Sequence, residues 1–213
     1  HQRRDPAGDG RPARLSAASA MAPASGPTGA TALIILDMIN LFDFEGGDRL
    51  GAQAVAICPR IAGLRRRFDA AGAPVIHVND NFAHWQGQFS DLVMACAAAG
   101  GHAGAVVQRL SPRPHDYHVL KPKHSGFLAT PLAILLAKLG VRRLVLTGVS
   151  ADSCVLATAQ GANMREYALW VPGDCVASIT PARKRDALGI VARSLRAPVL
   201  ATRSVAGLFP AQP

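Results

Sequence analysis

Cys154 is the residue whose type and position could do the most distinctive chemistry in this sequence. It lies in the segment TGVSADSCV (147–155), which follows the apolar run Leu144–Leu146 and precedes a helical pattern. Backbone N–H groups in the first turn of a helix lack intrahelical partners and carry partial positive charge, so they stabilise a thiolate. We therefore expect a nucleophilic cysteine with a lowered pKa. The alternative is a small buried hydrophobic residue, a common state for cysteine.

Two charged residues end other predicted strands. Asp37 closes the apolar run TALIILD (31–37), which is typical of a buried parallel strand, and Lys121 closes DYHVLK (116–121). Ligands in open α/β sheets bind beyond the carboxyl ends of the strands, so Asp37 is placed where a general base would be useful. An Asp that caps the next turn explains Asp37 equally well. A lysine that follows a strand is more often solvated than functional.

Together, the segments LDMINLFDF, VLKPKHSGF and TGVSADSCV resemble the isochorismatase-like cysteine hydrolases, over nearly the whole chain after its N-terminal tail. That family has an Asp–Lys–Cys triad in this chain order, which implies that Asp37, Lys121 and Cys154 are catalytic. The resemblance also implies a cis peptide bond between Val149 and Ser150. It further implies an oxyanion hole made by the amides of Ser150 and Cys154.

The loops beside the triad supply candidate residues for substrate contact. They are Asn40 and Phe42 after the first strand, Asn81, Phe82 and Trp85 after the second, and Phe127 after Lys121. Ordinary core or subunit packing explains the aromatic residues among them equally well.

The family resemblance also bears on the reaction. Its nicotinamidase branch has an Asp/His metal cluster after the second strand. The corresponding segment here, VNDNFAHWQGQF, offers His77, Asp80 and His84 but lacks the Asp-x-His pattern with a following His. We therefore expect no metal and no cofactor, and nicotinamide loses support as the substrate.

True isochorismatases cleave a vinyl ether, and well-known members have a small residue where this chain has Cys154. The cysteine thus favours hydrolysis of a C–N bond in a small amide, carbamoyl or ureido compound, through a thioester. Two alternatives stay open: a vinyl ether hydrolase, and a non-catalytic binding or assembly member of the same fold.

The order of the elements predicts the fold. Alternating strand and helix patterns indicate a single-domain, Rossmann-like, three-layer α/β/α structure with a mostly parallel sheet of about six strands. We expect strands at 31–37, 74–79, 116–121, 143–149, 168–172 and 198–202, and helices at 59–71, 90–99, 131–140, 150–167 and 180–195. Pro59 suits the first position of its helix, and Gly72 suits the position past its end. Residues 1–30 read as a disordered tail, 31–205 as the hydrolase domain and 206–213 as a C-terminal tail.

The amino-acid composition bears on membrane association and on the redox compartment of the protein. The 213 residues are 49% hydrophobic, yet no apolar stretch reaches the ~20 residues that span a bilayer, so we expect no membrane partner. The four cysteines show no paired metal spacing, which favours a reduced, cytoplasmic protein.

The net charge of +9 raises the possibility of nucleic-acid binding. However, the densest cluster, Arg65–Arg67, lies in a helix whose apolar stripe is Ile61, Leu64 and Phe68, so we expect these arginines on the solvent face. No nucleic-acid motif accompanies them, and we expect a small-molecule substrate without a nucleic-acid partner. The resemblance implies a homodimer or homotetramer. The segments 94–99 and 131–139 are candidate contact surfaces, although internal packing explains both equally well.

Overall fold

The computed structural model describes residues 30–82 and 86–211. The predicted disordered tail therefore lies outside the described residues, apart from Ala30. His84 and Trp85 lie outside them as well. No helix of the described part of the chain is both long and apolar enough to cross a membrane.

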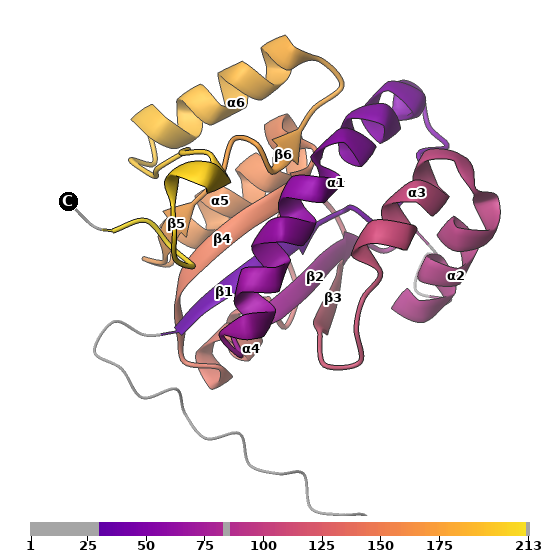
Figure 1. The fold of residues 1–213 in the computed structure, drawn as a ribbon. Coiled ribbons are helices and arrows are strands. Elements are labelled where there is room, and N and C mark those ends of the chain that lie inside the picture. Colours follow the sequence, from indigo (N-terminus) through magenta and orange to yellow (C-terminus); the bar gives the residue numbers. More distant parts are fainter. Residues whose placement is uncertain (1–29, 83–85, 212–213) are drawn as a thin grey trace, which may run out of the picture.

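A parallel sheet forms the middle layer of the fold (Figure 1). Within the described residues it has six strands: β1 (Ala30–Leu36), β2 (Val75–Asp80), β3 (Tyr117–Lys121), β4 (Val141–Val149), β5 (Ala168–Trp170) and β6 (Val176–Ala177). Their order is β3-β2-β1-β4-β5, and β6 also pairs with β4. All of these pairings are parallel, as the alternation of strands and helices predicts.

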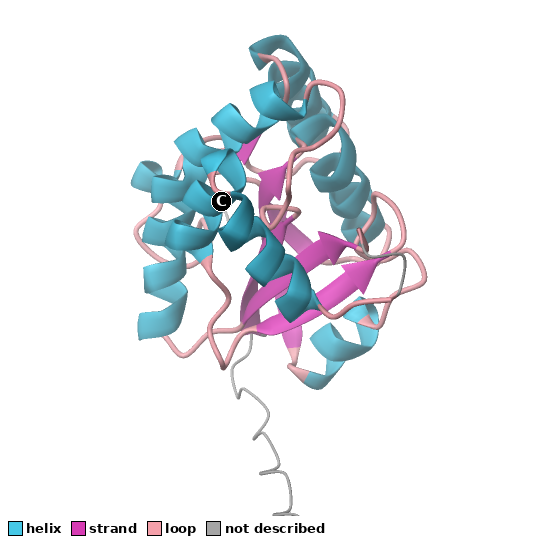
Figure 2. Cartoon of the chain, turned by 90° about the vertical axis from the view of Figure 1, so that its right-hand side faces the viewer, coloured by secondary structure: helices cyan, strands magenta, loops and turns pink. Residues whose placement is uncertain are grey.

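Helices cover both faces of this sheet (Figure 2). One face carries α1 (Gly47–Ala70), α2 (Phe89–Ala99) and α3 (Gly101–Leu110); the other carries α4 (Leu132–Lys138), α5 (Leu156–Asn163) and α6 (Pro181–Arg193). Side chains of β1 alternate between the two cores: Leu33 and Ile35 pack with the first helix set, and Ile34 and Leu36 with the second. The predicted three-layer, mostly parallel α/β/α fold is confirmed.

The first predicted helix was wrong in extent. Pro59 does not begin it but lies inside α1, a continuous helix of 24 residues. A proline inside a helix removes one hydrogen bond. Here the buried stripe continues on both sides of Pro59, from Leu50 and Ala54 to Leu64 and Phe68, so tertiary burial outweighs that loss.

Two further elements differ from the prediction. The sequence did not predict helix α3, because Gly100 and Gly101 are typical of the end of a helix. Both have positive φ, but Gly100 alone lies between the two helices and Gly101 begins α3. The expected strand at 198–202 does not form. The carbonyls of Pro198 and Val199 accept hydrogen bonds from Val171 and Gly173, but Pro198 has no N–H with which to continue a ladder. The sixth strand is β6, whose two residues are too few to show a pattern.

Two residues of the predicted C-terminal tail, 206–213, pack against the domain. Leu208 and Phe209 lie half-buried against the core on the α1 side of the sheet. The domain boundary at residue 205 stays a prediction.

Candidate active site

Four polar residues meet at the carboxyl edge of four adjacent strands. Lys121 ends β3, Asp80 ends β2, Asp37 follows β1, and Cys154 follows β4. From β1 the chain adds β2 and β3 on one side and then crosses to add β4 and β5 on the other side. The carboxyl edge between β1 and β4 is therefore a topological switch point. Open α/β sheets bind their ligands at such a point.

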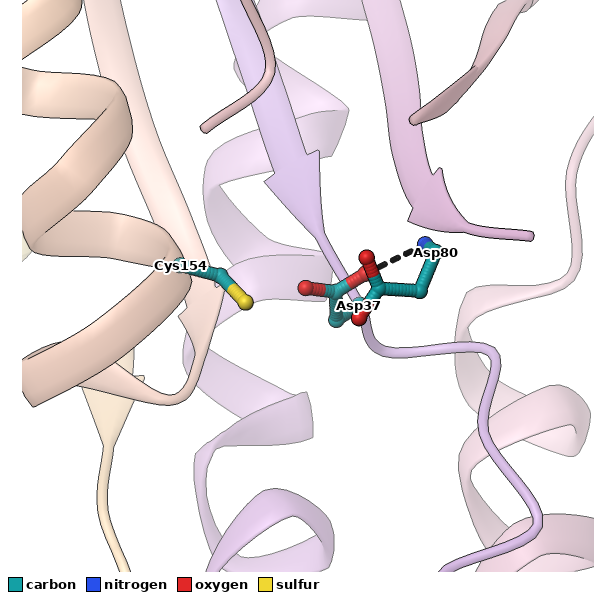
Figure 3. A group of neighbouring side chains, drawn as sticks. All are labelled: Asp37, Asp80 and Cys154. Atoms are coloured by element: carbon teal, nitrogen blue, oxygen red, sulfur yellow. Dashed lines mark hydrogen bonds between the residues drawn. The ribbon is translucent and has the colours of Figure 1, made fainter. Parts of the chain in front are cut away.

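The chain between β4 and Cys154 is shaped to bring the thiol over the sheet edge. Gly148 has φ 107°, and a Cβ there would lie 2.0 Å from the carbonyl oxygen of Leu36, so only glycine allows β4 to approach β1 this closely. One residue further on, the Val149–Ser150 peptide bond is cis, as the family resemblance implies. A π-helical turn, Ala151–Val155, then carries Cys154, whose side chain points toward Asp37 (Figure 3).

Asp37 is held at the turn that follows β1. Its φ is 49°, a left-handed conformation that Asp tolerates better than most residues, and its N–H donates to the carbonyl of Val78 at 3.0 Å. The carboxylate is buried. Its Oδ1 accepts a hydrogen bond from the backbone N–H of Asp80 at 2.7 Å (Figure 3), and its Oδ2 lies 2.9 Å from Lys121 Nζ.

Lys121 connects the other members of the group. Its side chain is fully buried, its Nζ lies 3.5 Å from Cys154 Sγ, and it forms a second ion pair with Asp80. The structure thus brings together the three residues that the sequence singled out, Asp37, Lys121 and Cys154, and adds Asp80. We refer to these four residues as the thiol cluster.

Burial dominates the ionisation of this cluster. It raises the pKa of Asp37 to about 6, with Lys121 opposing the rise and Asp80 adding to it. Burial also raises the pKa of Cys154 to about 12; the neighbouring Asp37 carboxylate adds to this rise, and Lys121 opposes it. Burial is the largest influence on Lys121 and alone would lower its pKa, but Asp37, Cys154 and Asp80 together outweigh burial, so the pKa of Lys121 is raised.

The expectation of a lowered thiol pKa is therefore wrong. A helical turn and one cation do not offset a buried site that already holds carboxylates. In the resting protein the thiol keeps its proton, Asp37 is ionised above pH about 6, and Lys121 is an ammonium. Such a cysteine becomes a nucleophile only when a base takes its proton during attack, and Asp37 is the base beside it.

A cavity of about 320 Å³ opens above the thiol cluster. Its apolar lining residues are Phe44, Leu50, Phe82, Val149 and Ile179, and its polar lining residues include Asn40, His124, Ser150, Asp152 and Arg183. Cavities of this size accept small molecules.

The six residues predicted to contact substrate divide into groups. Asn40 and Phe82 line the cavity. Asn81 is half-buried, and its N–H donates to the carbonyl of Lys121. Trp85 lies outside the described residues.

Phe42 and Phe127 are not retained as substrate contacts. Phe42 is buried in the core on the α1 side, because Asn40 Oδ1 accepts its N–H at 2.8 Å and turns the chain inward. Phe44, two residues later, reaches the cavity instead. Phe127 packs in the opposite core, with its ring stacked on Tyr167 at 6.0 Å.

Several residues of the site were missed from the sequence. Asp80 carries the same signal as Asp37, a charge that ends an apolar strand, and could have been found by it. Asp152 and His124 sit within the quoted motifs. Asp152 accepts hydrogen bonds from the hydroxyls of Ser150 and Ser178, and His124 Nδ1 lies 3.0 Å from Ser153 Oγ. Arg183 on α6 gave no local signal.

The cluster also has the composition of a metal site. Ligand atoms of Asp37, Asp80 and Cys154 lie within 4.8 Å of one another. However, Lys121 Nζ contacts all three, so the ammonium already supplies the positive charge at their centre. This donor set does not fit a metal ion, and independence from metal stays a prediction.

Comparisons with known proteins bear on the family of the chain. The isochorismatase domain family model matches residues 31–205. The isochorismatase family protein YaaI of Bacillus subtilis (strain 168), named as uncharacterized, is 37% identical over 147 residues, which is 69% of this chain and 80% of YaaI. The ureidoacrylate amidohydrolase RutB of Yersinia enterocolitica is 30% identical over 170 residues, 68% of this chain and 74% of RutB.

Solved structures show the same fold. The N-carbamoylsarcosine amidase of Thermoplasma acidophilum has a TM-score of 0.62 and 27% identity, with coverage of 84% of this chain and 99% of that chain. The nicotinamidase of Staphylococcus aureus has a TM-score of 0.63 and 24% identity, with coverage of 81% and 98%. With a family model that spans most of its length and a relative of this similarity, the chain belongs to the isochorismatase family.

Proposed function

We propose that the protein is a cysteine-dependent hydrolase of a C–N bond in a small amide, carbamoyl or ureido compound. One observation carries the proposal: Lys121 contacts both Asp37 and Cys154, and these two residues line a cavity of small-molecule size. Relatives named as ureidoacrylate amidohydrolase and N-carbamoylsarcosine amidase support the C–N bond as the target.

The proposed mechanism begins with Asp37 as the base. Asp37 accepts the thiol proton as Cys154 Sγ attacks the carbonyl carbon of the substrate. The negative charge leaves Asp37 and arrives on sulfur, 3.5 Å from the Lys121 ammonium. The carbonyl electron pair moves onto oxygen, and we assign the amides of Ser150 and Cys154 as the donors that hold this oxyanion.

Collapse of the tetrahedral intermediate breaks the C–N bond. Asp37 returns its proton to the departing nitrogen, which leaves as ammonia or an amine, and a thioester remains on Cys154. Asp37, ionised again, takes a proton from water, whose oxygen attacks the thioester carbon. Loss of the sulfur releases the acid, and the proton held by Asp37 restores the thiol.

A panel of amides, carbamoyl compounds and ureido acids, with ammonia release as the readout, tests this function. Cys154→Ala should lose at least about a thousandfold in kcat/KM while the fold persists. The matched control is Cys96→Ala, which removes a buried thiol of α2 away from the cavity and should retain activity. Hydrolysis of a panel compound that survives Cys154→Ala would point to C–N cleavage without a thiol nucleophile and contradict the proposal. Lack of any thiol reactivity would favour a binding role.

We also propose that copies of the chain associate as a dimer or tetramer. Met94 on α2 and Ile134 on α4 are 62% and 64% exposed, and they lie in the segments that the sequence suggested as contact surfaces. Light scattering at micromolar protein should give a multiple of 22.2 kDa, and a monomeric mass would contradict the proposal.

A further inference from the structure

Asp80 is the member of the thiol cluster that the mechanism above does not use. It is the last residue of β2, in register with Lys121 of β3. It touches the cluster twice: its backbone N–H donates to Asp37 Oδ1 at 2.7 Å, and its carboxylate pairs with Lys121 Nζ. Its side chain is 30% exposed, whereas those of Asp37 and Lys121 are 4% and 0% exposed.

This arrangement divides one ammonium between two carboxylates. Lys121 Nζ lies 2.9 Å from Asp37 Oδ2 and also contacts Asp80. With both carboxylates ionised and the thiol protonated, the four residues carry one excess negative charge. A cluster without Asp80 would be neutral, and the ammonium would then pair with Asp37 alone.

The excess charge bears on the proton transfer that starts catalysis. A carboxylate fully neutralised by a cation is a weak base, and a weak base is poorly matched to a thiol. We propose that Asp80 is a positioning residue which, by holding part of the Lys121 ammonium and presenting its amide to Asp37, sets how readily Asp37 takes the proton of Cys154. This role rests on the proposed function of Asp37 as the base.

The other groups around Asp37 do not replace this role. Cys154 faces it from the π-helical turn, and Lys121 faces it from β3. Further out in the cavity, His124 bonds to Ser153, while Asp152 pairs with two serine hydroxyls and lies 4.0 Å from Arg183. Among the described carboxylates, Asp80 alone shares the cation of Asp37.

Asp80→Asn removes the charge and keeps the backbone amide. The acid limb of the kcat/KM–pH profile should move down by about half a pH unit or more, because Asp37 then pairs with Lys121 alone. Alkylation of Cys154 by iodoacetamide should become about threefold faster at pH 7, the factor that half a unit represents for the thiolate fraction. A purely structural role would move neither profile.

Two further variants complete the test. Asp48→Asn removes an acid whose side chain is 94% exposed in the first turn of α1, and it should leave both profiles unchanged. Asp80→Glu keeps the charge and should restore the wild-type acid limb. Unchanged profiles in Asp80→Asn, or an equal shift in Asp48→Asn, would overturn the proposal.

A second variant and a readout that needs no substrate separate a folding defect from a loss of activity. If Asp80→Asn does not fold, Asp80→Ser repeats the measurement. Failure of both to fold would also overturn the proposal, because Asp80 would then serve stability. Alkylation needs no substrate, so a shifted alkylation profile with no hydrolysis of any panel compound would count against the proposed function and not against the role of Asp80.

Discussion

Two clusters of buried charge lie against β2 and β3, and they are built in opposite ways. The thiol cluster has two carboxylates for one ammonium and opens into a cavity. The second cluster, the Arg65 cluster, consists of Arg65, His77 and Asp116, whose side chains are at most 3% exposed. There a single carboxylate oxygen, Asp116 Oδ2, contacts the Arg65 guanidinium, the Arg113 N–H and His77 Nε2.

The difference shows in the two carboxyl groups. Burial raises the pKa of Asp37 to about 6, and its single cation does not offset this. Burial opposes ionisation of Asp116 as well, but hydrogen bonds from His77 and Arg113, together with the Arg65 charge, lower its pKa below 3.8. A buried carboxylate surrounded by donors is fixed in one state. One that shares its cation with a second carboxylate is ready to accept a proton.

A large effect on activity should separate two nearby lysines, Lys121 at the end of β3 and Lys123 two residues later. Lys121 is fully buried in the thiol cluster, while Lys123 is exposed. Lys121→Ala should lose at least about a hundredfold in kcat/KM, roughly 2.7 kcal/mol of transition-state stabilisation. Lys123→Ala should stay within about threefold of wild type. Steady-state kinetics on a substrate from the panel decide this, and the reverse order would place the cation of the triad on the wrong lysine.

The Arg65 cluster should respond to substitution in stability. Asp116→Asn leaves the buried Arg65 charge without its partner, so the free energy of unfolding should fall by about 3 kcal/mol, with kcat/KM of the folded protein little changed. Chemical denaturation measures the loss. If activity per folded molecule falls instead, the Arg65 cluster is part of the site.

Asp37→Asn should have the opposite pattern of effects, with activity lost and stability kept. It removes a carboxylate that burial disfavours, so activity should be lost while the free energy of unfolding at pH 7 stays equal or rises. A loss of stability as large as that of Asp116→Asn would contradict the distinction between the two clusters.

The clusters should also differ in their response to acid. Asp37 must be ionised to act as a base, so kcat/KM should fall as pH drops through about 6. Its raised pKa means that the native state binds this proton more tightly than the unfolded chain, so protonation of Asp37 favours the fold as pH drops through the same range.

His77 has the opposite linkage. Burial lowers its pKa below 6.5, so the unfolded chain takes up a proton first and stability falls as pH drops below 6.5. The slope is at most about 1.4 kcal/mol per pH unit. Denaturation of His77→Gln between pH 7 and 5 should show less of this slope than wild type, and an identical slope would contradict a buried neutral His77.

The smallest expected effect is that of chelation. Because Lys121 Nζ lies among the potential ligands, we expect activity to survive exhaustive removal of metal ions. Stoichiometric zinc or iron that is lost together with activity would contradict this.

The sequence was sufficient for the fold class. It also singled out Asp37, Lys121 and Cys154, partly for a physical reason, while their catalytic roles were implied by the family resemblance and stay a proposal. Strand ends are visible as charges that close apolar runs, and parallel strands bring those ends to one edge. Asp37 and Lys121 became candidates in this way, and the family resemblance then favoured them over a capping Asp and a solvated Lys. Asp80 also closes an apolar strand, but the sequence analysis considered it only as one residue of an incomplete metal-binding pattern.

Other features depend on contacts far along the chain. Arg65 was expected on the solvent face, yet it is 2% exposed, because Asp116, 51 residues later, supplies a buried partner. The pKa direction of Cys154 required knowing how deeply it is buried. The placement of Phe42 and Phe127 required side-chain directions that no local pattern contains.

Trapping the acyl-enzyme tests the central claim, that Cys154 is the nucleophile, most directly. Cys154 is 8% exposed and lines the cavity, whereas Cys58, Cys96 and Cys175 are fully buried. A hydrolysed panel compound is mixed with the protein, turnover is quenched in acid, and the cysteine peptides are mapped by mass spectrometry. We expect the acyl mass on the peptide that contains Cys154, and its absence when Asp37 is replaced by Asn. Steady turnover with no acyl group on Cys154, or an acyl group on another cysteine, would contradict the account.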